Sequence, residues 1–386
     1  MNTQAVYDFA PLAQMAVLAV LIGLGPLLWL WLRHRKSTPV VRLRALSVLA
    51  LFLTFDLILV GAFTRLTDSG LGCPDWPGCY GSASPLGASQ AITAAQSALP
   101  SGPVTHGKAW IEMTHRYLAA GVGVLITVLA IASWVQARAQ RAVVSPWWPT
   151  LTLAWVCLQG AFGAWTVTMR LYPAIVTAHL LLGIGLLSML AAQSQAYERK
   201  PLLISTRLHA GIVTVFTLCV VQVALGGWVS TNYAVLACSD FPTCQGGWWP
   251  SMDFAHGFTV LRELGAGKDG GYLPFAALTA IHMVHRIGAA VVFTAMALLV
   301  WRLRADGRAT TRRWAWAITA VAAWQFASGL SNVVLGWPLV AAVAHTGGAA
   351  ALITLLTVLL VRSRQARHSL LASRLPTPQL PQAAPG

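Results

Sequence analysis

Four histidines lie near the starts of long apolar stretches, where ionisable side chains are uncommon. His115 and His285 occur in the related segments IEMTHR and AIHMVHR. His179 and His345 occur in TAHLLLG and VAHTGGA. A histidine inside a membrane segment either joins helices through a hydrogen bond or marks a functional site. Its neutral ring can also bind a metal, so the four together raise the question of a metal centre.

The stretches that carry these histidines have the length and composition of membrane spans. Of the 386 residues, 56% are hydrophobic and 10% are charged, and the mean hydropathy is +0.65. A soluble domain carries about 25% charged residues, and about 20 helical residues cross a bilayer core. We therefore predict an all-α polytopic membrane protein with about nine spans. The expected spans are residues 11–32, 45–64, 112–135, 149–168, 173–195, 208–230, 278–301, 314–335 and 339–361.

The basic residues are distributed unevenly between the two sides of this predicted bundle. One side carries 19 of the 26 Lys and Arg residues, and the other side, which has the two long loops, carries seven. Cytoplasmic loops are the basic ones. We therefore expect a multi-pass protein of the cell (plasma) membrane, with its N-terminus outside and its C-terminus in the cytoplasm. The net charge of +15 is then an orientation signal, and no nucleic-acid partner is predicted.

Sequence landmarks recur at a nearly constant offset along the chain. CPDWPGC and CSDFPTC begin at Cys73 and Cys238, and GAFTR and GGWVS begin at Gly61 and Gly226, in both cases 165 residues apart. This constancy predicts two parallel repeats of four helices, preceded by one additional span. The predicted domains are the additional span with a basic loop (1–44), two four-helix bundles (45–200 and 201–365) and a disordered tail (366–386).

The four histidines are expected at one depth in these bundles. Their spans all enter from the outer side, and each histidine follows one to two turns later, about 5–10 Å into the membrane. Two imidazoles that face each other across a four-helix bundle are the usual axial ligands of a b-type haem. Zinc is disfavoured, because no Cys or carboxylate completes a tetrahedral set. The predicted pairs are His115 with His179 and His285 with His345.

Three arginines on the outer side are candidate partners of haem propionates. Arg65, Arg116 and Arg286 are placed there by the span assignment. A guanidinium matches the two oxygens of a carboxylate. The alternative is that these side chains only extend to the membrane surface.

The two repeats differ in one chemical group beside the ligand candidates. Glu112 precedes His115 by three positions, and His282 precedes His285 by three. Residues three apart share a helix face. A carboxylate at this place could take a proton or stabilise developing positive charge. We therefore expect one site to act on a substrate and the other to hold a cofactor; the alternative is that Glu112 is an ordinary interfacial residue.

Two cysteine pairs with equal spacing lie in the outer loops. Disulfides persist on the oxidising side of the membrane, so we expect Cys73 with Cys79 and Cys238 with Cys244. A disulfide that closes such a short loop removes little conformational entropy from the unfolded chain. A redox role and simple stapling of the loops are both left open.

The ordered motifs resemble those of haem A synthase. They are GAFTRLTDSGLGCPDWPGC, EMTHR, QGAFGAWTV, TAHLLLG, QVALGGWVSTN, HMVHR and AHTGGA, and the likeness covers about residues 50–360. The resemblance implies an eight-helix core of two four-helix bundles. It also implies an oxidoreductase that converts the C8 methyl of haem O to a formyl group, giving haem A for terminal oxidases. The additional first span departs from the common pattern of that family.

The resemblance also implies a role for each candidate residue. His285 and His345 map onto the ligands of a haem b cofactor. His115, His179 and Glu112 map onto the half that holds the substrate haem. Oxidation of an unactivated methyl group requires a metal or radical centre, which fits a haem enzyme.

A protein of another class would use the same histidines. A di-haem b membrane cytochrome that transfers electrons from quinol needs two histidine pairs, but it more often places its haems at two depths. The expected partners are haem O, delivered by haem O synthase, and membrane lipid. The electron acceptor is not identified by the sequence, and a homo-oligomer is left open.

Overall fold

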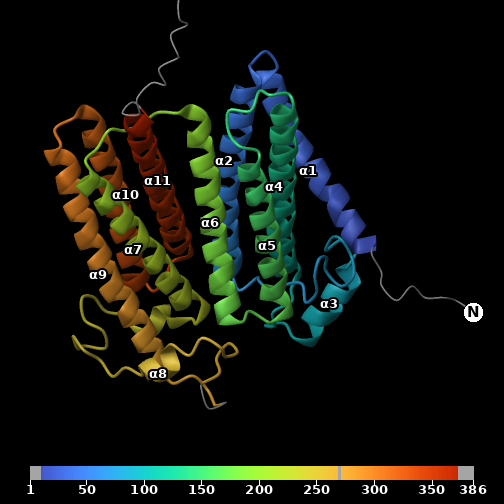
Figure 1. Cartoon of the computed structure of the whole chain (residues 1–386). Helices are drawn as coiled ribbons and strands as arrows, with labels where there is room; N and C mark the ends of the chain where they lie inside the picture. Colours follow the sequence, from blue (N-terminus) through green and yellow to red (C-terminus); the bar gives the residue numbers. More distant parts are fainter. Residues whose placement is uncertain (1–9, 268–270, 373–386) are drawn as a thin grey trace, which may run out of the picture.

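The computed structural model describes residues 10–267 and 271–372, and this part of the chain is helical between its loops (Figure 1). Nine of the helices described there are long and apolar enough to cross a membrane, which confirms the predicted all-α polytopic class. They are α1 (Ala10–His34), α2 (Pro39–Leu66), α4 (His106–Arg138), α5 (Trp147–Thr168), α6 (Pro173–Glu198), α7 (Thr206–Thr231), α9 (Phe275–Ala305), α10 (Ala309–Val334) and α11 (Leu339–Ala372). Short helices in the loops are α3 (Ser89–Ala98), η1 (Ala234–Ala237) and α8 (Phe254–Gly257).

Local residue chemistry sets where several spans begin. Pro39 and Pro173 occupy the first turn of their helices, where a missing N–H leaves no hydrogen bond unmade. The Thr105 side chain accepts from the backbone N–H three residues later and caps α4. Because of this cap, α4 begins at His106, six residues before the predicted span at residue 112.

The tail differs from the prediction over its first residues. Helix α11 continues to Ala372, so the disorder predicted from residue 366 is wrong for residues 366–372. No glycine or proline interrupts this segment before Pro376, and the helix therefore has no local reason to stop. The remainder of the predicted tail, 373–386, lies outside the described residues.

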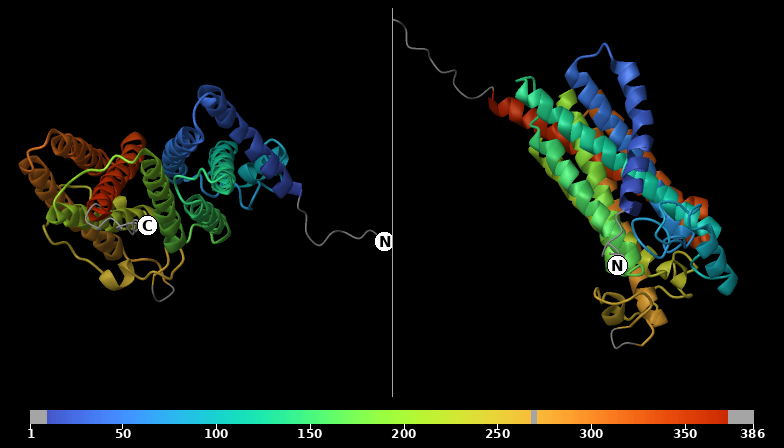
Figure 2. Two further views of the ribbon diagram at one scale, coloured as in Figure 1. Left: turned by 45° about the horizontal axis from the view of Figure 1, so that its top comes forward. Right: turned by 90° about the vertical axis from the view of Figure 1, so that its right-hand side faces the viewer.

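The spans form two four-helix bundles that stand side by side (Figures 1 and 2). Helices α2, α4, α5 and α6 make the first bundle, and α7, α9, α10 and α11 make the second. The bundles meet where α6 and α11 pack on each other, with α2 against α11 and α7 against α6. At this interface Gly347 of α11 faces Leu59 of α2, and Gly227 of α7 faces Thr177 of α6. Small residues let the helix backbones approach closely.

Contacts between equivalent residues reveal a pseudo-two-fold axis. Arg65 Nη2 donates to the Ser230 carbonyl at 2.7 Å, and the Tyr233 hydroxyl donates to Asp68 Oδ1 at 2.6 Å. Both pairs are 165 residues apart, which is the offset of the repeat. Residues that touch their own counterparts must lie beside a two-fold axis. The two bundles are therefore related as parallel repeats.

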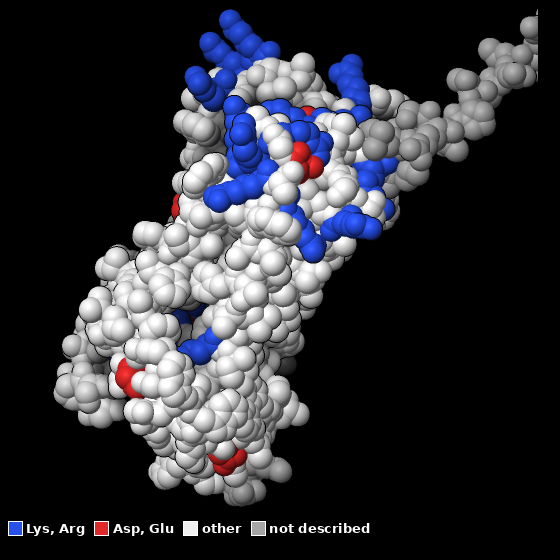
Figure 3. Space-filling model, turned by 90° about the vertical axis from the view of Figure 1, so that its left-hand side faces the viewer, with Lys and Arg blue, Asp and Glu red and all other residues white. Residues whose placement is uncertain are grey.

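The two ends of the molecule differ in charge. Lys and Arg side chains gather at one end, here called the basic end (Figure 3). The opposite end carries the two long connections with α3 and α8, here called the loop end (Figure 1). At the basic end, Arg362 donates to Gln195 Oε1 at 2.8 Å and pairs with Glu198 at 3.3 Å. The bundles are thus joined by polar contacts at both ends and by small-residue packing between them.

The additional helix α1 docks on the outside of the first bundle. A Cβ atom at Gly121 of α4 would lie 2.9 Å from Ile22 of α1, and a Cβ at Gly23 would lie 2.8 Å from Val124. The two glycines thus receive side chains from the facing helix. Close packing of this kind holds membrane helices together without a hydrophobic driving force.

We predict that Gly121→Val will loosen α1 from the bundle. Overpacking of a close helix contact costs about 1–3 kcal/mol, so the midpoint of thermal unfolding in detergent should fall. Gly123→Val is the matched control, because nothing lies within 4 Å of a Cβ at Gly123 and the helix propensity change is the same. Equal midpoints for the two variants would show that the α1–α4 contact contributes nothing.

Candidate functional site

Each of the four histidines packs its ring on a glycine of the preceding span. A Cβ built on each glycine would lie 3.0 or 3.1 Å from the Cε1 atom of the imidazole. Any side chain larger than glycine would therefore displace the ring. The pairs are Gly61 with His115, Gly163 with His179, Gly226 with His285, and Gly329 with His345.

These glycines place the four rings at one level. Each lies five residues before the last residue of its helix, at the ends Leu66, Thr168, Thr231 and Val334. All four ends are at the loop end of the molecule. The imidazoles are consequently held at the same distance from that end in both bundles.

Within each bundle the two imidazoles belong to one site. His115 of α4 lies within electrostatic range of His179 of α6. His285 of α9 has the same relation to His345 of α11. The structure thus brings together the two pairs that the sequence predicts, one in each bundle.

The state of the ring nitrogens fits a haem iron between the histidines of each pair. In the described part of the chain, no hydrogen bond engages Nε2 of any of the four rings. The Nδ1 atoms of His115 and His179 are buried without a partner. A coordinated iron would satisfy an imidazole nitrogen that otherwise lacks a partner in the membrane. Among the described residues no group of three or more His, Cys, Asp or Glu could hold another metal ion.

Glu112 is a buried carboxylate one turn of helix from His115. Its residue is 3% exposed. Oε2 accepts the Cys73 N–H at 2.8 Å, and Oε1 pairs with the guanidinium of Arg116. Gly72 lets the loop lie on α4 at this point, because a Cβ there would collide with the backbone of Lys108. A buried charge requires such partners.

The first disulfide loop is held by the same arginine. Cys73 and Cys79 are joined, as predicted, with their Cα atoms 4.9 Å apart. Arg116 Nη1 donates to the Asp75 carbonyl at 2.9 Å and to the carbonyls of Pro77 and Gly78. Glu112, Arg116 and the loop therefore form one hydrogen-bonded unit over the first histidine pair.

The second half repeats this unit without the carboxylate. The predicted disulfide between Cys238 and Cys244 is present. Arg286 donates to the carbonyls of Thr243 at 2.8 Å, Asp240 at 2.9 Å and Cys238 at 3.2 Å. In place of Glu112, the buried His282 has its Nδ1 2.9 Å from the Ala234 carbonyl. Among the described residues, each half therefore has one loop held by an arginine, and only in the first half does a buried carboxylate of the same helix pair with that arginine.

The acidic residue of the second loop stabilises its turn. Asp240 accepts from Thr243 Oγ1 at 2.7 Å, Gln245 N at 2.8 Å and Gly246 N at 3.0 Å. These hydrogen bonds, that from Thr243 first, lower the pKa of Asp240 to about 2. Because the pKa of Asp240 is lower in the folded than in the unfolded chain, its hydrogen bonds stabilise the fold at pH values above the unfolded pKa. This stabilisation is lost as the pH falls through about 2.

The arginines predicted to meet propionates have partners within the protein. Arg116 and Arg286 bind the loop carbonyls, and Arg65 Nη1 donates to the Tyr233 hydroxyl at 2.6 Å while its guanidinium stacks 4.0 Å from the Tyr233 ring. Arg65 thus joins the two bundles at the loop end. A role of all three in propionate binding stays a prediction.

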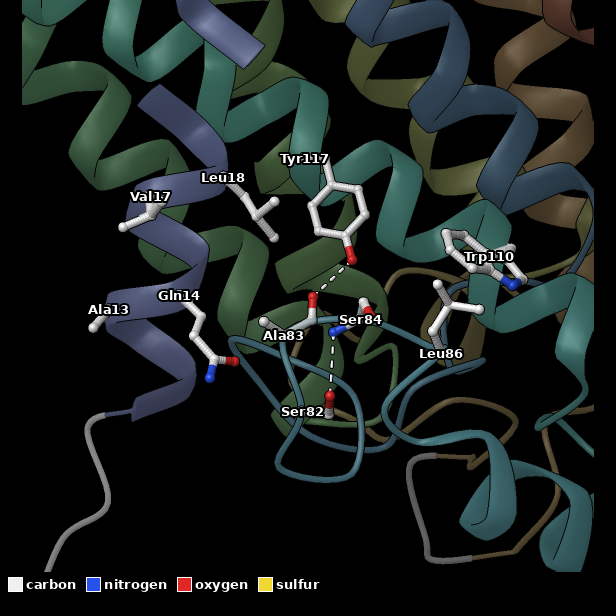
Figure 4. Close-up of a pocket in the computed structure, with 10 residues that line it drawn as sticks. All are labelled: Ala13, Gln14, Val17, Leu18, Ser82, Ala83, Ser84, Leu86, Trp110 and Tyr117. Carbon is white, nitrogen blue, oxygen red and sulfur yellow. Dashed lines mark hydrogen bonds between the residues drawn. The ribbon is translucent and has the colours of Figure 1, made fainter. Parts of the chain in front are cut away.

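A separate cavity of about 720 Å³ lies between α1, the first loop and α4 (Figure 4). Leu18 of α1 and the Trp110 and Tyr117 side chains of α4 line it, and Tyr117 donates to the Ala83 carbonyl at 2.6 Å. Tyr117 is two residues beyond His115, about 200° around the helix. The cavity is therefore on the back of α4 and does not belong to the histidine site.

The glycines beneath the histidines were missed as site residues. Gly61 and Gly226 belong to landmarks of the repeat, and Gly163 and Gly329 lie in matching segments, QGAFG and QFASG. The recurrence of these glycines at an offset of 165 or 166 residues was the signal in the sequence that could have identified them. Only the packing of adjacent helices shows that each one faces a ring.

The fold and the site define a polytopic membrane protein with a histidine pair in each of two parallel bundles. The family model described as cytochrome oxidase assembly protein (COX15-CtaA) matches residues 44–357. A protein named heme A synthase from Shewanella oneidensis is 36% identical over 80% of this chain and 93% of its own length. A protein of the same name from Halalkalibacterium halodurans is 26% identical over 78% of this chain and 91% of its own length. Another, from Chelativorans sp., is 30% identical over 75% of this chain and 82% of its own length.

The chain belongs to the cytochrome oxidase assembly protein family. The resemblance drawn from the sequence motifs is thereby confirmed. The match begins at residue 44, so the helix α1 lies before it.

We predict that Arg116→Met will destabilise the protein more than Arg286→Met. Both changes remove carbonyl contacts, but only the first leaves a buried carboxylate without its cation, a defect that costs about 3–5 kcal/mol. Thermal unfolding in detergent measures the difference. Adding Glu112→Gln should restore part of the loss in the Arg116→Met background. If the added change restored nothing, the pair would not be the source of the difference.

Proposed function

We propose that this protein is a haem A synthase, which oxidises the C8 methyl group of haem O to a formyl group. The observation that carries the proposal is the pair of equivalent histidine sites at one level, of which only one has a buried acid beside it. The names of the similar proteins support the same activity.

The two halves have different tasks in this proposal. His285 and His345 hold haem b as a cofactor, and His115 and His179 hold the substrate haem. Haem b supplies the redox-active iron that side chains lack. We assign the first half to the substrate because it contains the carboxylate of Glu112. The second half has a histidine, His282, at the equivalent position.

Glu112 acts on the substrate in the first half. Two successive hydroxylations of the methyl group give a geminal diol, and loss of water gives the aldehyde. A carboxylate can take a proton in these steps or stabilise positive charge that develops on the substrate. The Cys73 N–H and Arg116 fix both of its oxygens, so the group is oriented before the substrate enters.

The surroundings of the reaction follow from the membrane fold. Haem O is hydrophobic and reaches the site from the lipid or from haem O synthase. The basic end faces the cytoplasm, so the histidine pairs, the two loops and the N-terminus are on the outer side. Disulfides are stable there. An electron carrier of the di-haem b class would hold two haems and leave haem O unchanged, which the experiments below distinguish.

We predict that Glu112→Gln will fold, retain haem b and accumulate haem O or a hydroxylated intermediate in place of haem A. The amide keeps the shape of the side chain but removes its charge, so the loss should affect the transition state more than binding. Chromatography of haems extracted from membranes with a haem O source measures the outcome. Glu263→Gln is the control, since Glu263 is an exposed acid at the same end. Normal haem A output from Glu112→Gln would make Glu112 an ordinary interfacial residue.

We also predict that His285→Ala and His345→Ala will each abolish the tightly held haem b. One axial ligand does not hold the iron in a low-spin state. Absorption spectra of the purified variants measure this. His115→Ala and His179→Ala should keep the haem b spectrum and lose haem A production. Full haem b in both second-half variants would contradict the ligand assignment.

A further inference from the structure

The cavity between α1, the first loop and α4, here called the α1 cavity, has the size and composition of a ligand site (Figure 4). Its volume of about 720 Å³ lies within the range of sites that hold small organic molecules, and such sites are mostly apolar with a few polar groups. Val17 of α1 and Leu86 of the loop line it and are 59% and 74% exposed. The α1 cavity is therefore open at its rim to molecules of the membrane.

The polar groups of the α1 cavity come from two sides and have hydrogen bonds to spare. Gln14 belongs to α1, and Ser82 and Ser84 belong to the loop (Figure 4). Among the described residues, the Gln14 amide and the Ser84 hydroxyl make no hydrogen bond, and Ser82 Oγ only accepts from the Ser84 N–H at 3.4 Å. Amides and hydroxyls can each both donate and accept. The α1 cavity therefore suits a ligand that accepts hydrogen bonds in one state and donates them in another.

The lining of the α1 cavity favours a neutral ligand with an apolar body. None of the ten described residues that line it is charged, whereas a phosphate group is usually met by a cation. Gln14 precedes Leu18 on α1 by four residues and is therefore about 6 Å nearer the loop end. Trp110 and Tyr117 of α4 add aromatic surface. A polar head near the loop end and an apolar part toward the membrane centre match this arrangement.

One helix separates the α1 cavity from the first histidine pair. Tyr117 lines the cavity, and His115 is two residues away on the opposite side of α4. The separation is therefore about the diameter of a helix with its side chains, 10–12 Å. Electrons cross such a distance through protein without a carrier between the two sites.

We propose that the α1 cavity binds a membrane quinone, which accepts the electrons released by the oxidation in the first half. The redox part of this inference rests on the proposed function. A para-quinone is neutral and flat, has an apolar tail and carries carbonyl acceptors at two opposite ends of its ring. On reduction these carbonyls become hydroxyl donors, which the Gln14 amide and the serine hydroxyls can accept.

A quinone balances the proposed reaction. Each of the two hydroxylations, with oxygen from water, removes two electrons and two protons from the methyl carbon. One quinone takes up both and becomes a quinol. The sum is R–CH₃ + H₂O + 2 quinone → R–CHO + 2 quinol, in which the second water molecule is returned when the geminal diol loses water.

The additional helix gains a function from this assignment. One side of the α1 cavity is made by α1, and α1 lies before residues 44–357, which the family model matches. The site thus depends on a span that the matched part of the chain does not contain. The cavity also lies beside the first bundle, which is the half assigned to the substrate.

We predict that the full-length protein in detergent will bind decylubiquinone and that Ala13→Trp will abolish the binding by filling the α1 cavity. Ala13 lines the cavity. Ala16→Trp is the matched control, because Ala16 is exposed on the same helix and does not line it. Gln14→Leu and Ser84→Ala should each weaken binding by about 2–10-fold, the contribution of one neutral hydrogen bond. Equilibrium dialysis measures the dissociation constants, and equal values for Ala13→Trp and Ala16→Trp would overturn the inference.

Mass spectrometry of the lipids that co-purify distinguishes a quinone from a phospholipid. Quinone should be present in the unchanged protein and in Ala16→Trp, and it should be lost from Ala13→Trp. A phospholipid lost from Ala13→Trp, with the quinone content unchanged, would contradict the assignment.

Reduction of decylubiquinone tests the redox part. With haem O present, the unchanged protein should form two quinols for each haem A, and Ala13→Trp should lose this reaction while its haem b spectrum stays unchanged. Haem A production by Ala13→Trp at the normal rate would overturn the role as acceptor. The binding measurements need no turnover, so they stand apart from the proposed function. Failure of that function would appear as quinone binding without haem A from the unchanged protein.

Discussion

The contact between a buried imidazole and a glycine of the neighbouring helix sets the geometry of both bundles. A polar ring in the membrane is costly unless it faces a ligand or a cavity in the protein interior. The glycine has no side chain at that point, so the Cε1 edge of the ring can approach the facing helix closely. Because each glycine stands five residues from the end of its helix, this contact also fixes the level of each ring.

The loops over the histidine pairs extend this arrangement to the surface. In each half a short disulfide ring presents backbone carbonyls, and an arginine one residue beyond the histidine binds them. The histidine and the loop are therefore tied through adjacent residues of one helix. In the first half the same arginine also pairs with Glu112, so the position of the acid depends on the loop as well as on the helix. The cysteine pair thus has a positional effect on the acid whether or not it also exchanges electrons.

Duplication with an even number of spans explains why the two sites share one level. A four-helix repeat enters and leaves the membrane on the same side, so its copy is inserted the same way up. The contacts of Arg65 with Ser230 and of Asp68 with Tyr233 show that the copies are paired about an axis between them. Because the same four-helix scaffold occurs twice, the two histidine sites can differ through a few substitutions. Glu112 in one copy and His282 at the equivalent place in the other are such a difference.

The sequence by itself determined the class of the fold, the number of spans, the repeat and the identity of the four histidines. These follow from long apolar stretches, a constant offset and the rarity of ionisable residues in membranes, all of which are local or periodic signals. The two disulfides were also predictable, because both pairs have short and equal spacing. The extents of the helices were less predictable: the Thr105 cap begins α4 early and nothing ends α11 at residue 366.

Only the tertiary structure decided which groups face one another. Arg65 stacks on Tyr233 across the interface of the bundles, 168 residues away, a contact that the sequence did not predict. The pairing of Glu112 with the backbone of Cys73 joins residues 39 apart through a loop whose path no periodicity encodes. The glycines that face the rings are ordinary helix residues in the sequence. Their meaning depends on the rotation and height of neighbouring helices, which packing determines and local sequence does not.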